Sequence, residues 1–130
     1  MKRELTEYQK QALDYSRNIL LTANAGSGKT FVLSKRFVEI LLGGDADLEN
    51  IVAITFTDKA AGELNKRIAN EIDERILSET DNSKRKKLEN ARRQLVSANI
   101  STIHSFCINV LKEFAPEAGI DASFVPIDQF

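Results

Sequence analysis

Residues 18–30 read Asn18-Ile-Leu-Leu-Thr-Ala-Asn-Ala-Gly-Ser-Gly-Lys-Thr30, and this stretch predicts a strand, a loop and a helix in succession. It opens with an apolar run over 18–23 that has the length of a buried parallel strand. A loop of small residues follows, and then an amphipathic helix that we expect to end at Gly43 and Gly44. The side of this helix expected to face the core carries Val32, Leu33, Phe37, Ile40 and Leu41.

Strands and helices alternate on both sides of this stretch. A helix capped by Thr6 is expected before it, and an apolar strand over 51–56 follows it. Thr57 or Asp58 caps a long helix, a polar break covers 78–83, and a second helix comes next. A short third strand near 98–101 then leads into a last helix. The expected inward-facing side chains are Ala61, Leu64, Ile68, Ile72 and Ile76, then Leu88, Ala91 and Leu95, then Ile103, Phe106, Cys107, Val110, Leu111 and Phe114.

This order predicts an α/β fold with a mostly parallel sheet flanked by helices on both faces. In such folds ligands bind beyond the carboxyl ends of the strands. The loops at 23–29, 56–58 and 101–104 all fall at those ends. One edge of the expected sheet therefore gathers the candidate chemistry.

Composition narrows the class of protein. The 130 residues carry 18 basic and 19 acidic side chains, so the basic surplus typical of proteins that grip duplex DNA through its phosphates is absent. A narrow track for single-stranded DNA remains compatible with this balance. The lone cysteine, Cys107, excludes an internal disulfide and a multi-cysteine metal site, and its place in an apolar stripe predicts burial. No apolar run approaches the roughly 18 residues of a membrane helix and no secretory signal is present, so we expect a cytoplasmic protein.

Residues 23–30 match the phosphate-loop pattern G-x-x-x-x-G-K-[ST] at every position but the first, where Ala23 replaces glycine. Glycine permits backbone conformations that turn consecutive N–H groups toward a phosphate, and the dipole of the following helix favours the same anion. The lysine supplies an ammonium for the outer phosphates, and the threonine hydroxyl can ligate Mg²⁺. The alternative is a tight turn before a helix. The predicted triphosphate site comprises Ala23, Asn24, Ala25, Gly26, Ser27, Gly28, Lys29 and Thr30.

Four segments in order carry a resemblance to a known family. They are residues 5–13, the loop at 23–30, the run Ile54-Thr-Phe-Thr-Asp-Lys-Ala-Ala-Gly-Glu-Leu64 and the run Ser101-Thr-Ile-His-Ser-Phe-Cys107. Together they resemble the N-terminal part of a superfamily 1 DNA helicase of the UvrD/Rep type. The last run and the loop variant are most similar to the branch of AddA and RecB helicase–nuclease subunits. Alanine at the first loop position is usual in that family.

The resemblance implies a role for each matched residue. Gln9 corresponds to a glutamine that pairs with adenine, while Lys29 and Thr30 serve catalysis, with Thr30 on Mg²⁺. Phe56 would stack on a base, and Thr57 with the helix start after it would hold a DNA phosphate. Thr102 and His104 fall in the next DNA-contacting motif. Taken alone, three of these residues have a simpler reading: Gln9 is a solvated helix residue, Phe56 a core residue continuing the face of Ile54, and His104 a cap or packing residue.

The resemblance also implies how the chain is organised. Residues 1–130 would be the N-terminal part of the first motor domain, a RecA-like P-loop NTPase fold, ending before the Asp-Glu motif that ATP hydrolysis needs. Residues 115–130 would lead into an inserted subdomain. The expected cofactors are ATP and Mg²⁺. The expected partners are single-stranded DNA, a second motor domain of the same parent chain and a nuclease partner subunit, with no membrane. The parent would be an ATP-dependent DNA helicase in repair or recombination, and this part alone would hydrolyse little ATP.

Two further functions stay open at this level. A small P-loop kinase or a nucleotide-gated regulatory module would use the same loop without DNA, although lid arginines and an acceptor pocket are not recognisable. A degenerate module that only binds DNA is the other. The basic residues of 84–87, with Arg92 and Arg93, either touch a duplex or a partner, or form the solvated side of a helix.

Overall fold

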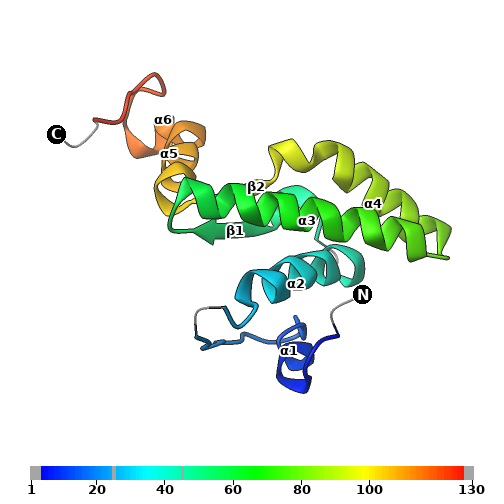
Figure 1. The fold of residues 1–130 in the computed structure, drawn as a ribbon. Coiled ribbons are helices and arrows are strands. Elements are labelled where there is room, and N and C mark those ends of the chain that lie inside the picture. Colours follow the sequence, from blue (N-terminus) through cyan, green and yellow to red (C-terminus); the bar gives the residue numbers. More distant parts are fainter. Residues whose placement is uncertain (1–3, 25, 45, 128–130) are drawn as a thin grey trace.

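The computed structural model describes residues 4–24, 26–44 and 46–127. Figure 1 shows helices packed against a small sheet. The elements in chain order are α1 (Glu7–Gln11), α2 (Lys29–Gly43), the 3-10 helix η1 (Leu48–Asn50), β1 (Val52–Thr55), α3 (Asp58–Ser78), α4 (Asn82–Gln94), the 3-10 helix η2 (Leu95–Ser97), β2 (Asn99–Thr102), α5 (Ile103–Glu113) and α6 (Ala115–Ala118). The fold is α/β, as expected.

The sheet of the described residues consists of β1 and β2, paired in parallel. Their register places Val52 opposite Asn99 and Thr55 opposite Thr102. The connection between them runs through α3 and α4. Because the strands are parallel and in register, both end at the same edge, and the residues that follow each of them come out side by side there.

The strand expected over 18–23 is wrong for this structure, because these residues have no regular secondary structure. In Figure 1 this segment runs beside α1, on the side of α2 that faces away from the strands. Leu20 is 90% exposed and Leu21 44% exposed. An apolar run becomes a strand only where a neighbouring strand supplies ladder hydrogen bonds, and neither β1 nor β2 pairs with this one.

The core lies between α2, α3, α4 and one face of β1. Its buried side chains are Phe37, Val38, Leu41, Leu48, Ile51, Ala53, Leu64, Ile68, Ile72, Leu88, Ala91 and Leu95. On β1, Ala53 faces this core while Val52 and Ile54 are 45% and 43% exposed on the other face. The expectation of a sheet covered on both faces is therefore wrong for the described residues.

Two helix stripes differ from expectation. On α2 Val38, which the expected stripe does not include, is buried together with Val32, Phe37 and Leu41, whereas Leu33 is 41% exposed. On α5 none of the residues is buried, and Cys107 is exposed, so the expected burial of its thiol is wrong. A helix with apolar residues at helical spacing is buried only where another element packs on that side, and α5 contacts the strands and α6 over a limited area. The stripes of α3 and α4 are confirmed, with Ile76 half-buried.

Within the described part of the chain, no helix combines the length and the apolar character that crossing a bilayer requires.

Candidate nucleotide and nucleic-acid site

The start of α2 differs from the starts of the other long helices. Side chains cap α3, α4 and α5, each by accepting a backbone N–H of the first turn; the capping residues are Thr57, Asp81 and Thr102. The N-cap of α2 is Gly28, and no side-chain cap hydrogen bond forms there among the described residues. The first N–H groups of a helix have no partner within the helix, and its dipole makes that end positive. The start of α2 is thus suited to an anion.

The loop before α2 has the backbone that the phosphate-loop pattern requires. Gly26 and Gly28 have φ values of 76° and 90°, a region that other residues rarely adopt. The Ser27 N–H donates to the Asn24 carbonyl at 3.3 Å and closes a turn. Ala23 and Thr30 are exposed on either side of this turn. The predicted site residue Ala25 lies outside the described residues.

Lys29 lies over this loop rather than away from it. Its ammonium donates to the Ala23 carbonyl at 2.7 Å and to the Asn24 carbonyl at 3.3 Å. An ammonium has three N–H donors, so one donor is left for an anion beside the loop. The side chain is exposed. The residue therefore stands at the mouth of the loop, where a phosphate held by the start of α2 would meet it.

Gln9 reaches the same loop from α1. Its Oε1 accepts the Thr6 N–H at 3.0 Å while the Thr6 hydroxyl accepts the Gln9 N–H, which together form a capping box. Its Nε2 donates to the Ser27 carbonyl at 3.3 Å. The simpler reading of Gln9 as a purely solvated residue is wrong, because its amide joins α1 to the loop.

A second group of predicted residues lies at the carboxyl edge of the sheet. Phe56 follows β1 directly and its side chain is 86% exposed, so the alternative that Phe56 continues the core is wrong. Thr57 caps α3 through a 3.1 Å hydrogen bond from the Ala60 N–H. An exposed aromatic ring beside a helix start presents a stacking face next to free backbone N–H groups.

The residues after β2 complete this edge. Thr102 is 6% exposed; its hydroxyl accepts the Ser105 N–H at 3.2 Å and donates to the Ser105 hydroxyl at 3.1 Å. Its side chain is thereby fixed as the cap of α5. His104 is exposed on the first turn of α5, so it is neither the cap nor a packed residue. The structure brings Phe56, Thr57 and His104 to one edge and places the Thr102 side chain beneath it.

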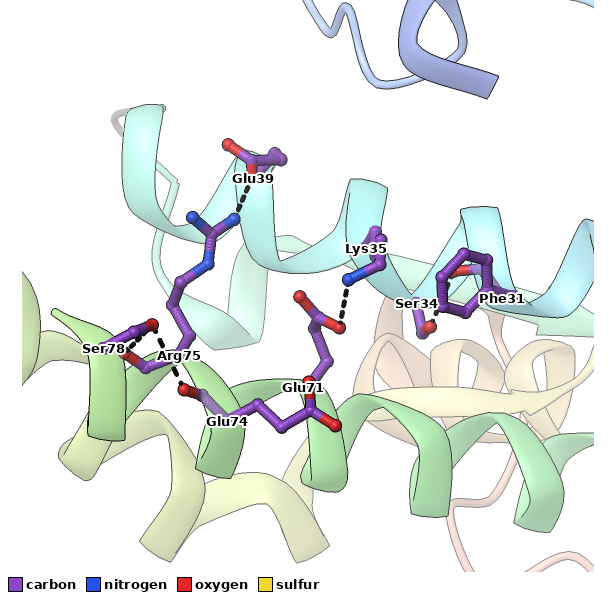
Figure 2. Close-up of polar contacts among 8 residues, drawn as sticks. All are labelled: Phe31, Ser34, Lys35, Glu39, Glu71, Glu74, Arg75 and Ser78. Atoms are coloured by element: carbon purple, nitrogen blue, oxygen red, sulfur yellow. Dashed lines mark hydrogen bonds and ion pairs between the residues drawn. The ribbon is translucent and has the colours of Figure 1, made fainter. Parts of the chain in front are cut away.

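Two ion pairs join α2, which begins at the phosphate loop, to α3, which begins directly after Phe56 and Thr57 (Figure 2). The sequence analysis did not predict these pairs. Lys35 contacts Glu71 at 2.7 Å, with both side chains largely buried, and Arg75 contacts Glu39. Each helix carries its two charges four residues apart, at the same offset between the helices, so the helices run in the same direction here. In Figure 1 both begin on the side where the arrowhead of β1 points. The paired i, i+4 charges were the signal available in the sequence.

The basic run on α4 mainly makes contacts within the chain. Arg92 pairs with Asp73 at 2.9 Å and Arg85 with Glu89 at 3.8 Å. Lys87 donates to the carbonyls of Gly44 and Ala46. These contacts favour the reading of a solvated helix face over that of a duplex-binding patch.

Comparison with known proteins shows which family this sequence matches. The sequence model of the UvrD/REP helicase N-terminal domain matches residues 5–130. The chain is 36% identical over 127 residues to an ATP-dependent helicase/nuclease subunit of Pediococcus pentosaceus, covering 97% of this chain and 10% of the relative. Against the corresponding subunit of Alkaliphilus metalliredigens it is 39% identical over 124 residues, covering 95% and 10%. The chain thus spans about a tenth of the length of these curated relatives.

Proposed function

Because this chain belongs to the UvrD/REP helicase family, whose N-terminal domain it matches, we propose that it forms the ATP-binding front part of the first motor domain of a DNA helicase. In this proposal residues 1–130 have a RecA-like P-loop fold, and 115–130 lead into an inserted subdomain. The whole protein moves along single-stranded DNA at the expense of ATP, in repair or recombination. The relatives carry the name of ATP-dependent helicase/nuclease subunits, which supports this activity.

The observation that carries the proposal is the uncapped start of α2 behind two glycines with positive φ. The described residues of the loop, 23–24 and 26–30, surround the polyphosphate, with the N–H groups of the first turn and the third N–H donor of Lys29 directed to its oxygens. The Gln9 amide faces the adenine. These residues fit a nucleoside triphosphate because they offer donors to an anion and place no carboxylate within the loop.

The site offers one protein oxygen as a ligand for Mg²⁺, the hydroxyl of Thr30. Thr30 is exposed on the first turn of α2, where its hydroxyl adjoins the phosphate position. Among the described residues no cluster of three or more His, Cys, Asp or Glu side chains is placed to hold a metal ion. Thr30 would hold a magnesium ion here together with phosphate oxygens and water, which is the common manner of Mg²⁺ binding in ATPases, and the ion would neutralise phosphate charge.

The DNA strand lies along the carboxyl edge of the sheet. Phe56 stacks on a base, the backbone N–H groups after Thr57 hold a phosphate, and His104 donates to the strand from α5. Thr102 serves this contact by fixing the start of α5. Stacking with few charges agrees with a chain whose net charge is only −1.

Nucleotide and DNA are coupled through α2 and α3. One helix begins at the phosphate loop and the other directly after Phe56 and Thr57, and the ion pairs Lys35–Glu71 and Glu39–Arg75 join them side by side. A shift of α2 that follows ATP therefore moves α3 with it. In the proposal a second motor domain of the same parent chain closes on this one, and a nuclease subunit is a further partner.

The test compares two substitutions in the full gene product. Lys29→Ala should abolish ATP turnover, because it removes the ammonium from the outer phosphates. Phe56→Ala should leave turnover without DNA intact and raise the single-stranded DNA concentration for half-maximal stimulation about 5- to 150-fold, since one stack contributes ~1–3 kcal/mol.

The matched control is Leu77→Ala, since Leu77 is 83% exposed at the opposite end of α3. This variant should behave as the unmodified protein with and without DNA. Equal loss of turnover in both conditions for Phe56→Ala would contradict the assignment of Phe56 to DNA.

A further inference from the structure

Arg36 links α2 to the end of α1. It lies seven residues after Lys29 on α2, and its Nη1 donates to the carbonyls of Ala12 and Asp14, both at 2.7 Å. These carbonyls belong to the C-cap of α1 and the turn that follows. Hydrogen bonds from a guanidinium are charge-assisted, and the positive charge also suits the carboxyl end of a helix.

The segment that Arg36 holds has little support of its own. The helix α1 has five residues and none of them is buried, and helices this short do not persist without tertiary contacts. The side chain of Ala12, directly after α1, is buried, with 5% of its surface exposed. Further along, Tyr15 packs over Gly43, where any side chain would overlap the tyrosine hydroxyl. Arg36 therefore lies between the loop contact of Gln9 and the contact of Tyr15, and holds the backbone of the segment against α2.

The position of this segment determines which hydrogen-bond donor and acceptor the Gln9 amide presents to a nucleotide base. Its Oε1 faces the Thr6 N–H and its Nε2 faces the Ser27 carbonyl, which fixes which end of the amide accepts and which donates. Each end keeps one further lone pair or N–H. Adenine presents one donor and one acceptor on its edge, whereas guanine presents two acceptors there. An amide held in one orientation pairs with the first base and opposes the second, whereas an amide free to move loses that distinction.

We infer that Arg36 is a positioning residue for base selection: by bonding Ala12 and Asp14 it keeps α1 against α2, and so holds the Gln9 amide in the orientation that selects adenine. Arg36 itself touches no nucleotide. The inference rests on the proposed nucleotide site and adds to it the residue that sets its choice of base.

The test measures kcat/KM for ATP and for GTP in the full gene product. Arg36→Met keeps the aliphatic stem and removes the donors. It should lower the ATP-over-GTP ratio roughly fivefold or more, mainly by raising the KM for ATP, while kcat at saturating ATP stays near that of the unmodified protein. Arg36→Lys, which keeps a charge without the planar fork, should give an intermediate ratio. In a Gln9→Ala background, Arg36→Met should change the ratio no further.

Arg17→Ala is the matched control, because Arg17 is an exposed arginine of the same segment that pairs with the Asp14 carboxylate and not with α2. It should keep the full ratio. An unchanged ratio for Arg36→Met, with a lowered ratio for Gln9→Ala, overturns the role of Arg36 alone. An unchanged ratio for Gln9→Ala overturns base reading by Gln9, on which the inference rests. Should thermal unfolding show that Arg36→Met is unfolded, Arg36→Lys decides, and an undiminished ratio in that variant overturns the inference.

Discussion

Lys35 makes two contacts that a fully solvated lysine would not hold. Its ammonium lies 2.7 Å from the Glu71 carboxylate and 5.0 Å from the centre of the Phe31 ring. The two charged side chains are 20% and 11% exposed, so water screens their attraction only in part. Arg92 and Asp73, 44% and 50% exposed, form a pair of the ordinary surface kind. The two pairs therefore allow a comparison within one molecule.

Double-mutant cycles on the free energy of unfolding should separate these pairs. The Lys35→Met and Glu71→Gln cycle is expected to give a coupling free energy above about 1 kcal/mol, because each single change leaves a poorly hydrated charge without its partner. The Arg92→Met and Asp73→Asn cycle should give about 0.2–1 kcal/mol, and less at high salt. Chemical denaturation followed by circular dichroism measures both. Equal couplings would contradict the distinction drawn from burial.

At the scale of single residues, the sequence predicted the members of the phosphate loop but not the contacts between residues far apart in the chain. Gly26, Gly28 and Lys29 were found because the phosphate loop needs those residue types at that spacing. Their backbone angles and contacts agree with that pattern. The α2–α3 ion pairs and the Arg36 contacts were not found, because they join residues more than 20 positions apart and depend on how the helices pack.

Among the secondary-structure elements, α4 shows most directly how a side chain starts a helix. Asp81 accepts the N–H groups of Ser83 and Lys84 at 2.8 and 3.2 Å. The hydrogen bond from the Lys84 N–H, followed by that from Ser83, holds the pKa of the Asp81 carboxyl below its usual value of 3.8. A lowered pKa in the folded state means that the carboxylate stabilises the fold above the unfolded pKa and that this contribution is lost as the pH falls.

Asp81→Asn should therefore change the acid dependence of stability more than stability itself. Asparagine caps a helix about as well as aspartate but does not titrate in this range. Between pH 5 and pH 2 the midpoint of denaturant unfolding should fall less steeply for the variant, and at pH 7 the two midpoints should be close. Glu113→Gln, at the end of α5, serves as a control for the loss of one acidic charge. If the unfolding midpoints of Asp81→Asn and of the unmodified chain fell equally steeply between pH 5 and pH 2, this role of the cap would be contradicted.

The sequence predicted those features of the elements that depend on neighbouring residues in the chain, such as helix caps. The caps Thr6, Thr57 and the glycine end of α2 were found, as were the two strands that pair. The strand expected over 18–23 was wrong because strand formation depends on a neighbour that no local pattern reveals. The burial expected for Cys107 was wrong for the same reason, since a helical stripe shows which side is apolar and not what packs on it.

Over the whole molecule, apolar surface gathers away from the core. Val110 and Leu111 on α5 are 38% and 42% exposed, Phe114 directly after α5 is 50% exposed, and Ile54 on the open face of β1 is 43% exposed. Contiguous apolar patches and open strand edges favour association between molecules.

The isolated 130-residue chain should therefore sediment as a concentration-dependent mixture of monomer and larger species. Val110→Glu, which places a charge within the α5 patch, should shift that mixture toward the monomer. Leu77→Glu adds the same charge at an exposed site at the far end of α3, and should leave the mixture unchanged. A monomer at all concentrations, or equal effects of the two variants, would contradict association through α5.

The amide of Gln9 also restricts how such a protein can change over evolutionary time. The same side chain that we propose to face the nucleotide completes the capping box that begins α1. A substitution that altered the preferred base would, in one step, weaken the first turn of a helix that has only five residues and no buried side chain. With that proposed role, a substitution of Gln9 would be penalised twice, and a lineage that adopted another nucleotide would need a compensating change near Thr6 before it could tolerate a different side chain at position 9.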